Sequence, residues 1–259
     1  MPPTRTAHAR EYASEKVKTL SVIVPMLNEE LAIAPTLDAI AAGASGAEVI
    51  VEVIVVDGGS SDRSRDEARP RCARLLVAPR GLARQMNAGA ATAEGDALAF
   101  VHADTLVPPT FARDIAVALA DPAFVGGRFD LRLDDDAPML RLIGWLISVR
   151  SRLSRTGTGD QAIFVRREVF ERLGGYRDIA LCEDLDLARR LKRAGRVACL
   201  RSQVTASARQ WRERGVLATT ARMWFIRIAF LLGVSPSRLA HLYNRGGPVE
   251  NEGERSISG

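Results

Sequence analysis

The first hundred residues alternate between short apolar runs and longer stretches in which apolar side chains recur at helical spacing. The short runs are rich in Val, Ile and Leu and end at turn-forming residues, so they predict strands over residues 20–25, 51–56, 75–77 and 97–101. The stretches between them predict helices over 29–42 and 81–91. Such alternation implies right-handed βαβ units in a mostly parallel sheet with helices on both faces.

After residue 120 the pattern becomes less regular. It predicts two more strands, over 125–133 and 162–165, and helices over 138–153, 184–194 and 212–233. We expect one α/β domain over residues 19–210, followed by carboxyl-terminal helices over 211–245 that pack on it or lie at a membrane surface. The polar ends, 1–18 and 246–259, are expected to be a disordered extension and a disordered tail.

The charge of the chain narrows the choice of partners only slightly. A net charge of +5 favours contact with phosphate groups, which nucleic acids, nucleotide sugars and anionic lipids all carry. The sequence has no zinc finger, no aromatic RNA-binding signature and no long basic block, so nucleic acid is not an expected partner.

Cysteine usage and the amino-terminal segment bear on the compartment. The three cysteines, Cys72, Cys182 and Cys199, form no CxxC pair, so neither a disulfide framework nor a zinc site is expected. The first 18 residues lack the apolar stretch of a secretory signal. We therefore expect a cytoplasmic protein, with a peripheral position on the inner face of the cell membrane as a further possibility.

Polar or glycine-containing turns follow three of the predicted strands. They are Pro25-Met26-Leu27-Asn28-Glu29, Asp57-Gly58-Gly59-Ser60-Ser61-Asp62 and His102-Ala103-Asp104. In open parallel sheets, ligands bind outside the carboxyl ends of the strands. Helix capping explains any one of these turns equally well, but three in succession favour a ligand site.

These turns resemble the motifs of glycosyltransferase family 2. The matching segments are Val22-Ile23-Val24-Pro25 with Asn28-Glu29, Val56-Asp57-Gly58-Gly59-Ser60-Ser61-Asp62, Arg84 with Asn87 and Gly89, His102-Ala103-Asp104, and Glu183-Asp184. The resemblance spans about residues 20–209. Further segments, 83–87, 100–104 and 159–164, resemble a bacterial subgroup associated with arsenosugar biosynthesis and radical-SAM enzymes.

The resemblance implies a GT-A, Rossmann-like fold and an inverting transfer of sugar from a nucleotide-sugar donor, with UDP as the expected nucleotide. It implies that Asp57 recognises the base and that Arg84 stacks on or contacts it, and the carboxylate of Asp57 can accept a hydrogen bond from the uracil imide. The full set of nucleotide-binding candidates is Pro25, Asn28, Glu29, Asp57, Gly58, Arg84, Asn87, His102 and Ala103. A solvated helix face is the alternative for Arg84.

Asp104 is the expected ligand of Mn²⁺ or Mg²⁺, which favour carboxylate oxygens and would neutralise the leaving diphosphate. His102 stands where the family has another Asp, and is a second metal or ribose candidate; the alternative is a histidine satisfied within its turn. This replacement favours one alternative function, a catalytically inactive nucleotide-sugar-binding module. Retention of Asp57, Asp104 and Asp184 together favours an enzyme.

Glu183 and Asp184 precede a predicted helix, where the helix dipole alone favours carboxylates. The family resemblance makes Asp184 the general base that deprotonates the acceptor, with Glu183 beside it. Gly159, Asp160 and Gln161 form a polar turn that we expect on the acceptor side. The acceptor itself, whether a small molecule or a lipid, is not specified by any pattern in the sequence.

Other nucleotide-binding classes lack their motifs in this chain. No GxGxxG follows the first strand, as a dinucleotide-binding dehydrogenase requires, and no GxxxxGK[ST] occurs, which excludes a P-loop NTPase. The glycine-rich basic loop with which many nucleotidyltransferases open is also missing.

The most apolar long stretch covers residues 216–234. At helical spacing it places one stripe on a face, formed by Leu217, Trp224, Phe225, Ile228, Leu231 and Leu232. Arg222 and Arg227 flank the stripe, and their insertion cost of roughly +5 to +7 kcal/mol exceeds the roughly −4 kcal/mol of the apolar residues, which disfavours spanning. The stripe either lies at a membrane surface or packs on the sheet or on helix 138–153.

Overall fold

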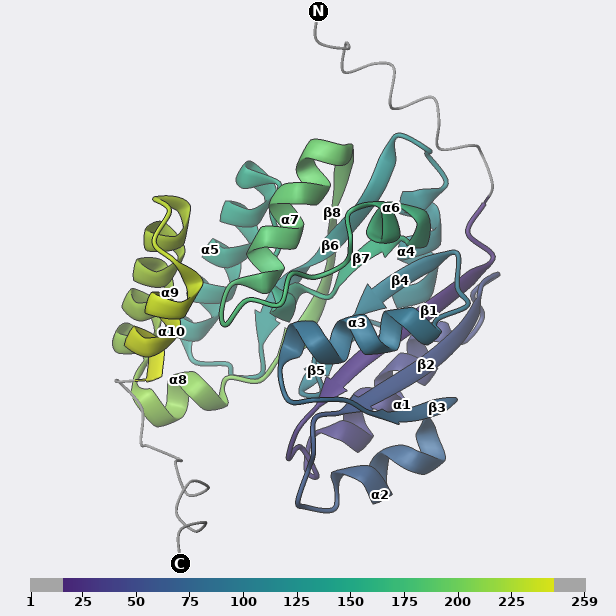
Figure 1. Cartoon of the computed structure of the whole chain (residues 1–259), viewed down its shortest axis with the longest axis horizontal. Coiled ribbons are helices and arrows are strands. Elements are labelled where there is room, and N and C mark those ends of the chain that lie inside the picture. Colours follow the sequence, from purple (N-terminus) through teal and green to yellow (C-terminus); the bar gives the residue numbers. More distant parts are fainter. Residues whose placement is uncertain (1–15, 245–259) are drawn as a thin grey trace, which may run out of the picture.

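A computed structural model describes residues 16–244 and centres on an eight-stranded mixed sheet with the order β3-β2-β1-β4-β7-β6-β8-β5 (Figure 1). The strands are β1 (Thr19–Met26), β2 (Ile50–Asp57), β3 (Arg74–Val77), β4 (Ala97–Phe100), β5 (Thr105–Leu106), β6 (Phe124–Leu133), β7 (Ile163–Arg166) and β8 (Arg196–Ala206). The predicted disordered ends, except residues 16–18, lie outside the described residues.

The sheet consists of a parallel part and a mixed part. Strands β3, β2, β1 and β4 pair in parallel, as the sequence predicts. Strand β7 then runs antiparallel to both β4 and β6, whereas β6 and β8 pair in parallel. Because β1, β2 and β4 run in one direction, the turns that follow them meet at one edge of the sheet.

Helices cover both faces of the sheet. They are α1 (Ile33–Ala44), α2 (Ser64–Ala68), α3 (Leu82–Thr92), α4 (Phe111–Leu119), α5 (Pro138–Ser154), α6 (Arg167–Arg172), α7 (Glu183–Ala194), α8 (Arg209–Arg214), α9 (Val216–Leu231) and α10 (Pro236–Asn244). Alternate side chains of β1 enter different cores: Val22 and Val24 pack with α1 and α4, and Ile23 packs with α3, α6 and α7. This two-sided burial explains the nearly continuous apolar strands.

A glycine allows α3 to pack closely against the sheet. A Cβ on Gly89 would lie 2.5 Å from Cγ2 of Ile23 and 3.0 Å from Cγ2 of Val56. The glycine therefore sets how near α3 and the turn before it approach the ends of β1 and β2.

The single helix predicted over 212–233 is wrong, because the chain breaks at Gly215. Its φ of 83° is left-handed, which favours glycine and ends α8 before α9 begins. The six residues of the predicted stripe on α9 are all exposed, while Thr219, Ile226 and Ala229 form the buried side. The stripe therefore packs neither on the sheet nor on α5. No helix within residues 16–244 is long and apolar enough to cross a bilayer.

Candidate functional site

Two neighbouring cavities lie at the end of the sheet where β1 and β4 finish. The strand-end cavity, of about 320 Å³, is lined by Pro25, Met26, Leu27, Glu29, Arg80, Gly81, Leu82, Gln85, His102, Ala103 and Asp104. The helical cavity, of about 430 Å³, takes its lining from α5, α7, α8, α9 and the turn at 158–160. His102 and Leu82 line both, so the two cavities adjoin there.

His102 is held between these cavities by the turn that contains Gly159. Its Nδ1 lies 3.4 Å from a carboxylate oxygen of Asp160. A Cβ on Gly159 would lie 2.5 Å from its Nε2, so only glycine leaves room for the ring. Burial by itself lowers the pKa of His102, but the hydrogen bond to Asp160 and the charges of Asp160, Asp104 and Asp184 raise it to about 9.

Asp104 lies on the strand-end cavity, and its carboxylate suits a divalent cation. The pKa of Asp104 is raised above its usual value by burial. The charge of His102 lowers this pKa, and the charges of Asp160 and Glu29 raise it. Within the described part of the chain, no group of three or more metal-ligating side chains gathers in one place. One carboxylate together with ligand phosphates still fits Mg²⁺ or Mn²⁺, which commonly bind in that way. His102 is already paired with Asp160 and fits less well as a ligand.

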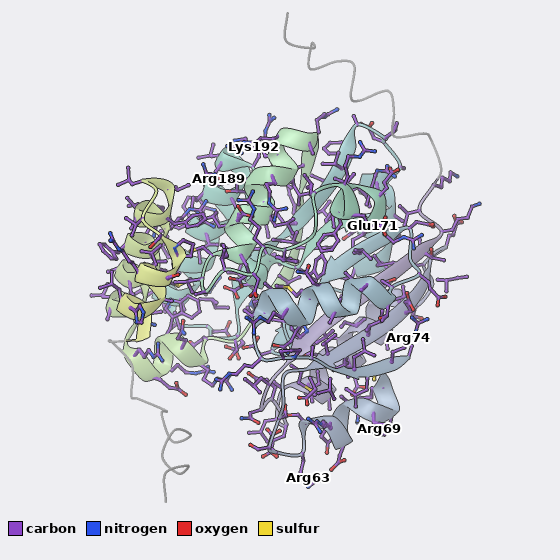
Figure 2. All side chains as sticks on the ribbon, in the orientation of Figure 1. Arg63, Arg69, Arg74, Glu171, Arg189 and Lys192 are labelled. Carbon is purple, nitrogen blue, oxygen red and sulfur yellow. The ribbon has the colours of Figure 1, made fainter. Side chains whose placement is uncertain are left out.

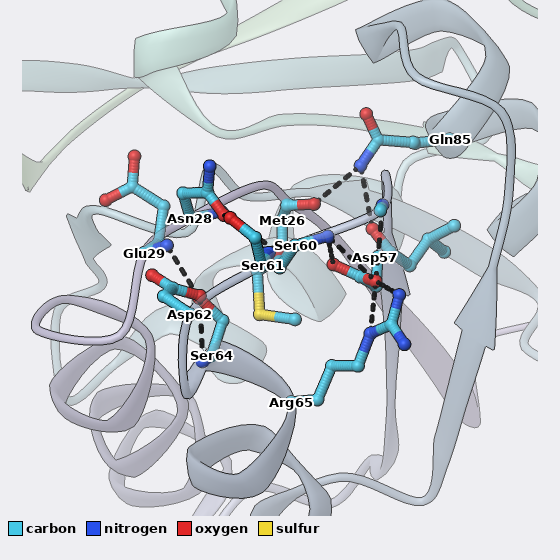
Figure 3. Close-up of polar contacts among 12 residues, drawn as sticks. Met26, Asn28, Glu29, Asp57, Ser60, Ser61, Asp62, Ser64, Arg65 and Gln85 are labelled. Carbon is cyan, nitrogen blue, oxygen red and sulfur yellow. Dashed lines mark hydrogen bonds and ion pairs between the residues drawn. The ribbon is translucent and has the colours of Figure 1, made fainter.

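The turns after β1 and β2 hold each other in place (Figure 3). Asn28, at a left-handed φ of 53°, accepts a hydrogen bond from the backbone N–H of Ser61 on its side-chain oxygen, and its own backbone N–H donates to the hydroxyl oxygen of Ser60. The backbone N–H of Glu29 donates to Ser64, and its carboxylate pairs with Arg209 of α8 at 2.9 Å. Of these residues, Glu29 lines the strand-end cavity, and Asn28 and the serines hold the two turns together.

Asp57 is fully buried at the end of β2. It accepts hydrogen bonds from the backbone of Gly59 and Ser60 and forms an ion pair with Arg65 at 2.5 Å (Figure 3). Burial raises its pKa, but the hydrogen bonds from Ser60 and the interaction with Arg65 together hold that pKa below its usual value. Recognition of a base by Asp57 stays a prediction, and it requires Arg65 to share this carboxylate.

Gly58, a nucleotide-binding candidate, lies against the side chain of Gln85 and does not line the strand-end cavity. A Cβ on Gly58 would lie 3.0 Å from the side chain of Gln85. Buried Gln85 donates to the carbonyls of both Met26 and Val56, and so joins the ends of β1 and β2 (Figure 3). Pro25 and Ala103, in contrast, line the strand-end cavity as expected for nucleotide-binding candidates.

Two candidates on α3 lie away from both cavities. Arg84 is half exposed and pairs with Asp178 at 2.9 Å. Asn87 binds both the carbonyl and the N–H of Tyr176, which fastens α3 to the segment after α6. Neither residue lines the strand-end cavity, where Arg80 is the arginine present.

Glu183 and Asp184 line the helical cavity at the start of α7. Asp184 accepts hydrogen bonds of 2.6 Å from the backbone of Gly159 and of Leu185. Burial raises the pKa of Asp184, although the hydrogen bond from Gly159 lowers it. Burial and the nearby charge of Asp184 raise the pKa of Glu183 to about 7. Cys182, just before them, has a left-handed φ of 68° that is rare outside glycine.

The turn expected on the acceptor side is divided. Gly159 and Asp160 line the helical cavity next to Asp184. Gln161 does not reach it: this side chain is fully buried and donates to the carbonyl of Phe129 and the hydroxyl of Ser151. It anchors the turn to β6 and α5, because an amide inside the protein must satisfy its hydrogen bonds there.

Several lining residues were not candidates from the sequence. Arg80 lines the strand-end cavity, and the helical cavity contains Arg150, Trp211, Thr220 and Arg227. An arginine that interrupts an apolar helix was the available signal for Arg150 and Arg227. The sequence gives no sign that α5 and α9 lie beside α7.

The mixed sheet, the cavity at its strand ends and the adjoining cavity with a partly buried acid define a group-transfer enzyme of the GT-A type. Residues 21–174 match the model of Glycosyl transferase family 2, which is more than half of the chain. The chain therefore belongs to that family and is a glycosyltransferase. The matched range ends before α7, so it does not include Glu183 and Asp184.

Individual relatives are more distant. The chain is 31% identical over 118 residues to validoxylamine A glucosyltransferase of Streptomyces hygroscopicus subsp. limoneus, a match that covers 43% of this chain and 26% of that protein. The chain thus spans about a quarter of that relative's length.

Two solved structures share the fold. Mannosyltransferase PcManGT from Pyrobaculum calidifontis, solved with GDP-Man and Mn²⁺, has a TM-score of 0.61 at 20% identity and covers 92% of this chain and 75% of its own. S. aureus TarS 1–349 with UDP has a TM-score of 0.57 at 19% identity and covers 73% and 60%.

Proposed function

We propose that this glycosyltransferase takes sugar from a nucleotide-sugar donor, with UDP preferred, and transfers it with inversion to a small-molecule or lipid acceptor. The observation that carries the proposal is the meeting of two cavities at His102, with Asp104 on one side and Asp184 on the other. The donor diphosphate suits the strand-end cavity, and the acceptor suits the helical cavity. GDP-Man and UDP in the structural neighbours support a nucleotide-sugar donor.

Asp184 is the general base of this mechanism. It takes the proton of the acceptor hydroxyl as that oxygen attacks the anomeric carbon, on the face opposite the leaving diphosphate. Its raised pKa makes it a stronger base than an ordinary carboxylate, and the hydrogen bond from Gly159 fixes its orientation. Attack from the opposite face inverts the anomeric centre.

Asp104 is the residue that would hold Mn²⁺ or Mg²⁺ together with the donor phosphates. The metal supplies Lewis-acid stabilisation of the leaving diphosphate when it is bound. Mn²⁺ beside GDP-Man in the Pyrobaculum neighbour supports this use of a divalent cation. Glu29, paired with Arg209, lines the same cavity.

A donor screen tests the proposal. Release of nucleoside diphosphate is measured from UDP-glucose, UDP-N-acetylglucosamine, GDP-mannose and ADP-glucose, with and without Mn²⁺, and with a cell extract as acceptor. We expect metal-dependent turnover of a UDP-sugar, and an α-linked donor should give a β-linked product by NMR. Donor binding without turnover would instead support the inactive binding module, and an α-linked product would contradict inversion.

The subgroup assignment belongs to this proposal as well. Segments 83–87, 100–104 and 159–164 support membership of the arsenosugar and radical-SAM-associated glycosyltransferases. Arsenosugar formation in a bacterial host, lost on deletion of this protein and restored by its return, is the expected outcome. Unchanged arsenosugar levels after deletion would contradict a function in arsenosugar formation.

A peripheral position at a membrane surface is the last part of the proposal. Its support is the apolar face of α9, defined as exposed Leu217, Trp224, Phe225, Ile228, Leu231 and Leu232. Helix α5 packs beside α9 and exposes Trp145 and Leu146, while basic Arg141 and Arg238 are exposed on α5 and α10. Figure 2 shows further basic side chains, Arg189 and Lys192, on neighbouring α7. An apolar face with basic neighbours suits the headgroup region of anionic lipid.

Flotation with phosphatidylglycerol-containing vesicles, at low and moderate salt, tests this position. We expect the protein to float with anionic vesicles and the variant Phe225→Ser to float less. Leu31→Ser is the matched control, because Leu31 is 87% exposed and lies two residues before α1, outside the apolar face of α9. Wild-type protein that stays at the bottom at both salt concentrations would contradict the membrane position.

A further inference from the structure

We infer that the acceptor is an anionic amphiphile, whose hydroxyl lies beside Asp184, whose anionic group binds Arg150 in the helical cavity, and whose apolar part lies against α5 and α9. This inference rests on the proposed function, since it names the class of molecule that would fill the acceptor side.

The helical cavity contains buried donors with no acceptor in the protein. Among the described residues, Nε and Nη2 of Arg150, Nε1 of Trp211 and the hydroxyl of Thr220 are buried and lack a hydrogen-bond partner. Trp211 is 4% exposed, so solvent does not replace a partner on its side chain. Buried polar groups normally find partners, and an unpaired buried guanidinium is especially unfavourable. Indole and guanidinium groups only donate, so the ligand must supply acceptor oxygens.

The charge of this lining favours an anion. Burial, followed by the charge of Arg227, lowers the pKa of Arg150 to about 10, which still leaves it cationic at neutral pH. Arg227 of α9 is a second cation on the same cavity and donates to Thr156 at 2.9 Å. The carboxylates of the cavity come from other elements, α7 and the turn at 158–160. A phosphate or carboxylate beside α5 and α9 can therefore be separate from the hydroxyl beside Asp184.

The rest of the lining is apolar and continues to the surface. Ile143 and Ile147 of α5 and Met223 of α9 line the cavity with no polar atom on their side chains. Leu146 and Trp224 also line it, and both are nearly half exposed. Trp224 belongs to the apolar face of α9 proposed above as membrane-bound. The cavity therefore opens beside that face, which suits an acceptor with an apolar chain.

Calorimetry with three probes tests the inference on the wild-type protein. Dodecyl phosphate, below its critical micelle concentration, carries both the anion and the chain; glycerol 3-phosphate lacks the chain, and dodecyl maltoside lacks the anion. We expect dodecyl phosphate to bind at least about tenfold more tightly than either of the others, since a charge-assisted hydrogen bond and a buried chain each supply that much. If dodecyl maltoside binds as tightly as dodecyl phosphate, the acceptor need not be an anion. If glycerol 3-phosphate binds as tightly, the acceptor need not carry an apolar chain.

Variants assign the binding to the cavity. Arg150→Gln should weaken the binding of dodecyl phosphate about tenfold or more. Arg113→Gln, at an exposed arginine on α4 that lines neither cavity, should leave this binding unchanged. Unchanged affinity in Arg150→Gln would overturn the inference. If that variant fails to fold, Thr220→Val removes a single unpartnered hydroxyl instead. It should weaken the binding of dodecyl phosphate more than the binding of dodecyl maltoside.

UDP binding distinguishes this inference from the proposed function. Arg150 lines only the helical cavity, so Arg150→Gln should bind UDP as the wild type does. A wild-type protein that binds UDP but does not favour dodecyl phosphate over the other two probes would overturn the acceptor class and keep the donor chemistry. A protein that favours dodecyl phosphate but binds no nucleoside diphosphate would keep the cavity assignment and overturn the proposed function.

Discussion

The two cavities are built in opposite ways. Around the strand-end cavity, polar groups are satisfied by the chain itself: Asn28 by Ser60 and Ser61, and Asp57 by its own turn and Arg65. In the helical cavity, Arg150 and Trp211 have buried donors with no protein partner. The turns at the first site are held by contacts within the chain, whereas the second presents buried donors that a ligand can pair with.

This difference is the one we expect if the strand-end cavity binds the donor and the helical cavity binds the acceptor, as proposed above. A diphosphate presents the same groups in every nucleotide sugar, so a site fixed by backbone and short side chains suits it. Acceptors differ in shape, and arginines on helices outside the parallel part of the sheet can be changed without altering β1, β2 or β4. The variants of Asp184, Asp104 and Gly159 below each affect one cavity or the boundary between them, and so test whether the two cavities act separately.

The largest effect is expected from Asp184→Asn in the helical cavity. Loss of a general base typically lowers turnover by about 10² to 10⁴-fold, and donor binding should remain because the strand-end cavity is untouched. Steady-state kinetics with UDP calorimetry measures both. Asp186→Asn, two residues along the same helix and paired with Arg190 at 2.7 Å, is the matched control and should keep its turnover. A loss under about tenfold for Asp184→Asn would leave this residue a helix-capping role.

Next in size is the effect of Asp104→Asn in the strand-end cavity. Metal stabilisation worth about 3 kcal/mol corresponds to roughly a hundredfold in turnover. Excess chelator should abolish wild-type turnover, and the variant should need more Mn²⁺ to reach its maximum. Asp160→Asn is the comparison on the other side of His102, and its Mn²⁺ requirement should stay as in the wild type. Full activity in chelator would show that the leaving group is stabilised without metal.

The parallel part of the fold could be predicted because its strands carry strong local signals. β1 and β2 are apolar on both faces and end at turn residues, and their predicted bounds lie within two residues of the structure. β8 escaped prediction because Arg201, Ser202 and Gln203 interrupt its apolar pattern. The break at Gly215 was missed because apolar spacing continues past it and glycine alone is a weak signal inside a helix.

The site residues were predictable where a motif lies at a strand end, and not where contacts join distant segments. Asp104 and Asp184 line cavities as the family motifs suggested. The partners of Asp57, Gly58 and Gln161 come from α2, α3, β6 and α5, and no local spacing in the sequence specifies them. The ion pair of Arg84 with Asp178 also joins distant segments, and contact of Arg84 with the nucleotide stays a prediction.

Gly159→Ala tests the boundary between the cavities. Its Cβ would lie 2.5 Å from Nε2 of His102, so the ring or the turn must move, at a cost of about 1–3 kcal/mol in stability. The same shift displaces the N–H that orients Asp184, so we expect turnover to fall by about tenfold, with thermal unfolding to measure stability. Gly46→Ala is the control for lost stability: unlike Gly159, Gly46 has a left-handed φ, of 70°, which alanine strains, but nothing lies within 4 Å of its Cβ, so neither His102 nor Asp184 is displaced. Equal turnover in both variants would separate His102 from catalysis.

The smallest expected effect is a preference for UDP over GDP and ADP through Asp57, of about fivefold, because one hydrogen bond with a net contribution of about 1 kcal/mol supplies that difference. Calorimetry with the three diphosphates measures it. Asp57 is buried and paired with Arg65, so Arg65→Gln should free the carboxylate and keep or increase the preference, whereas Asp57→Asn should reduce it. If Asp57→Asn keeps the UDP preference while its stability falls, then Asp57 only closes its own turn, and other residues recognise the base.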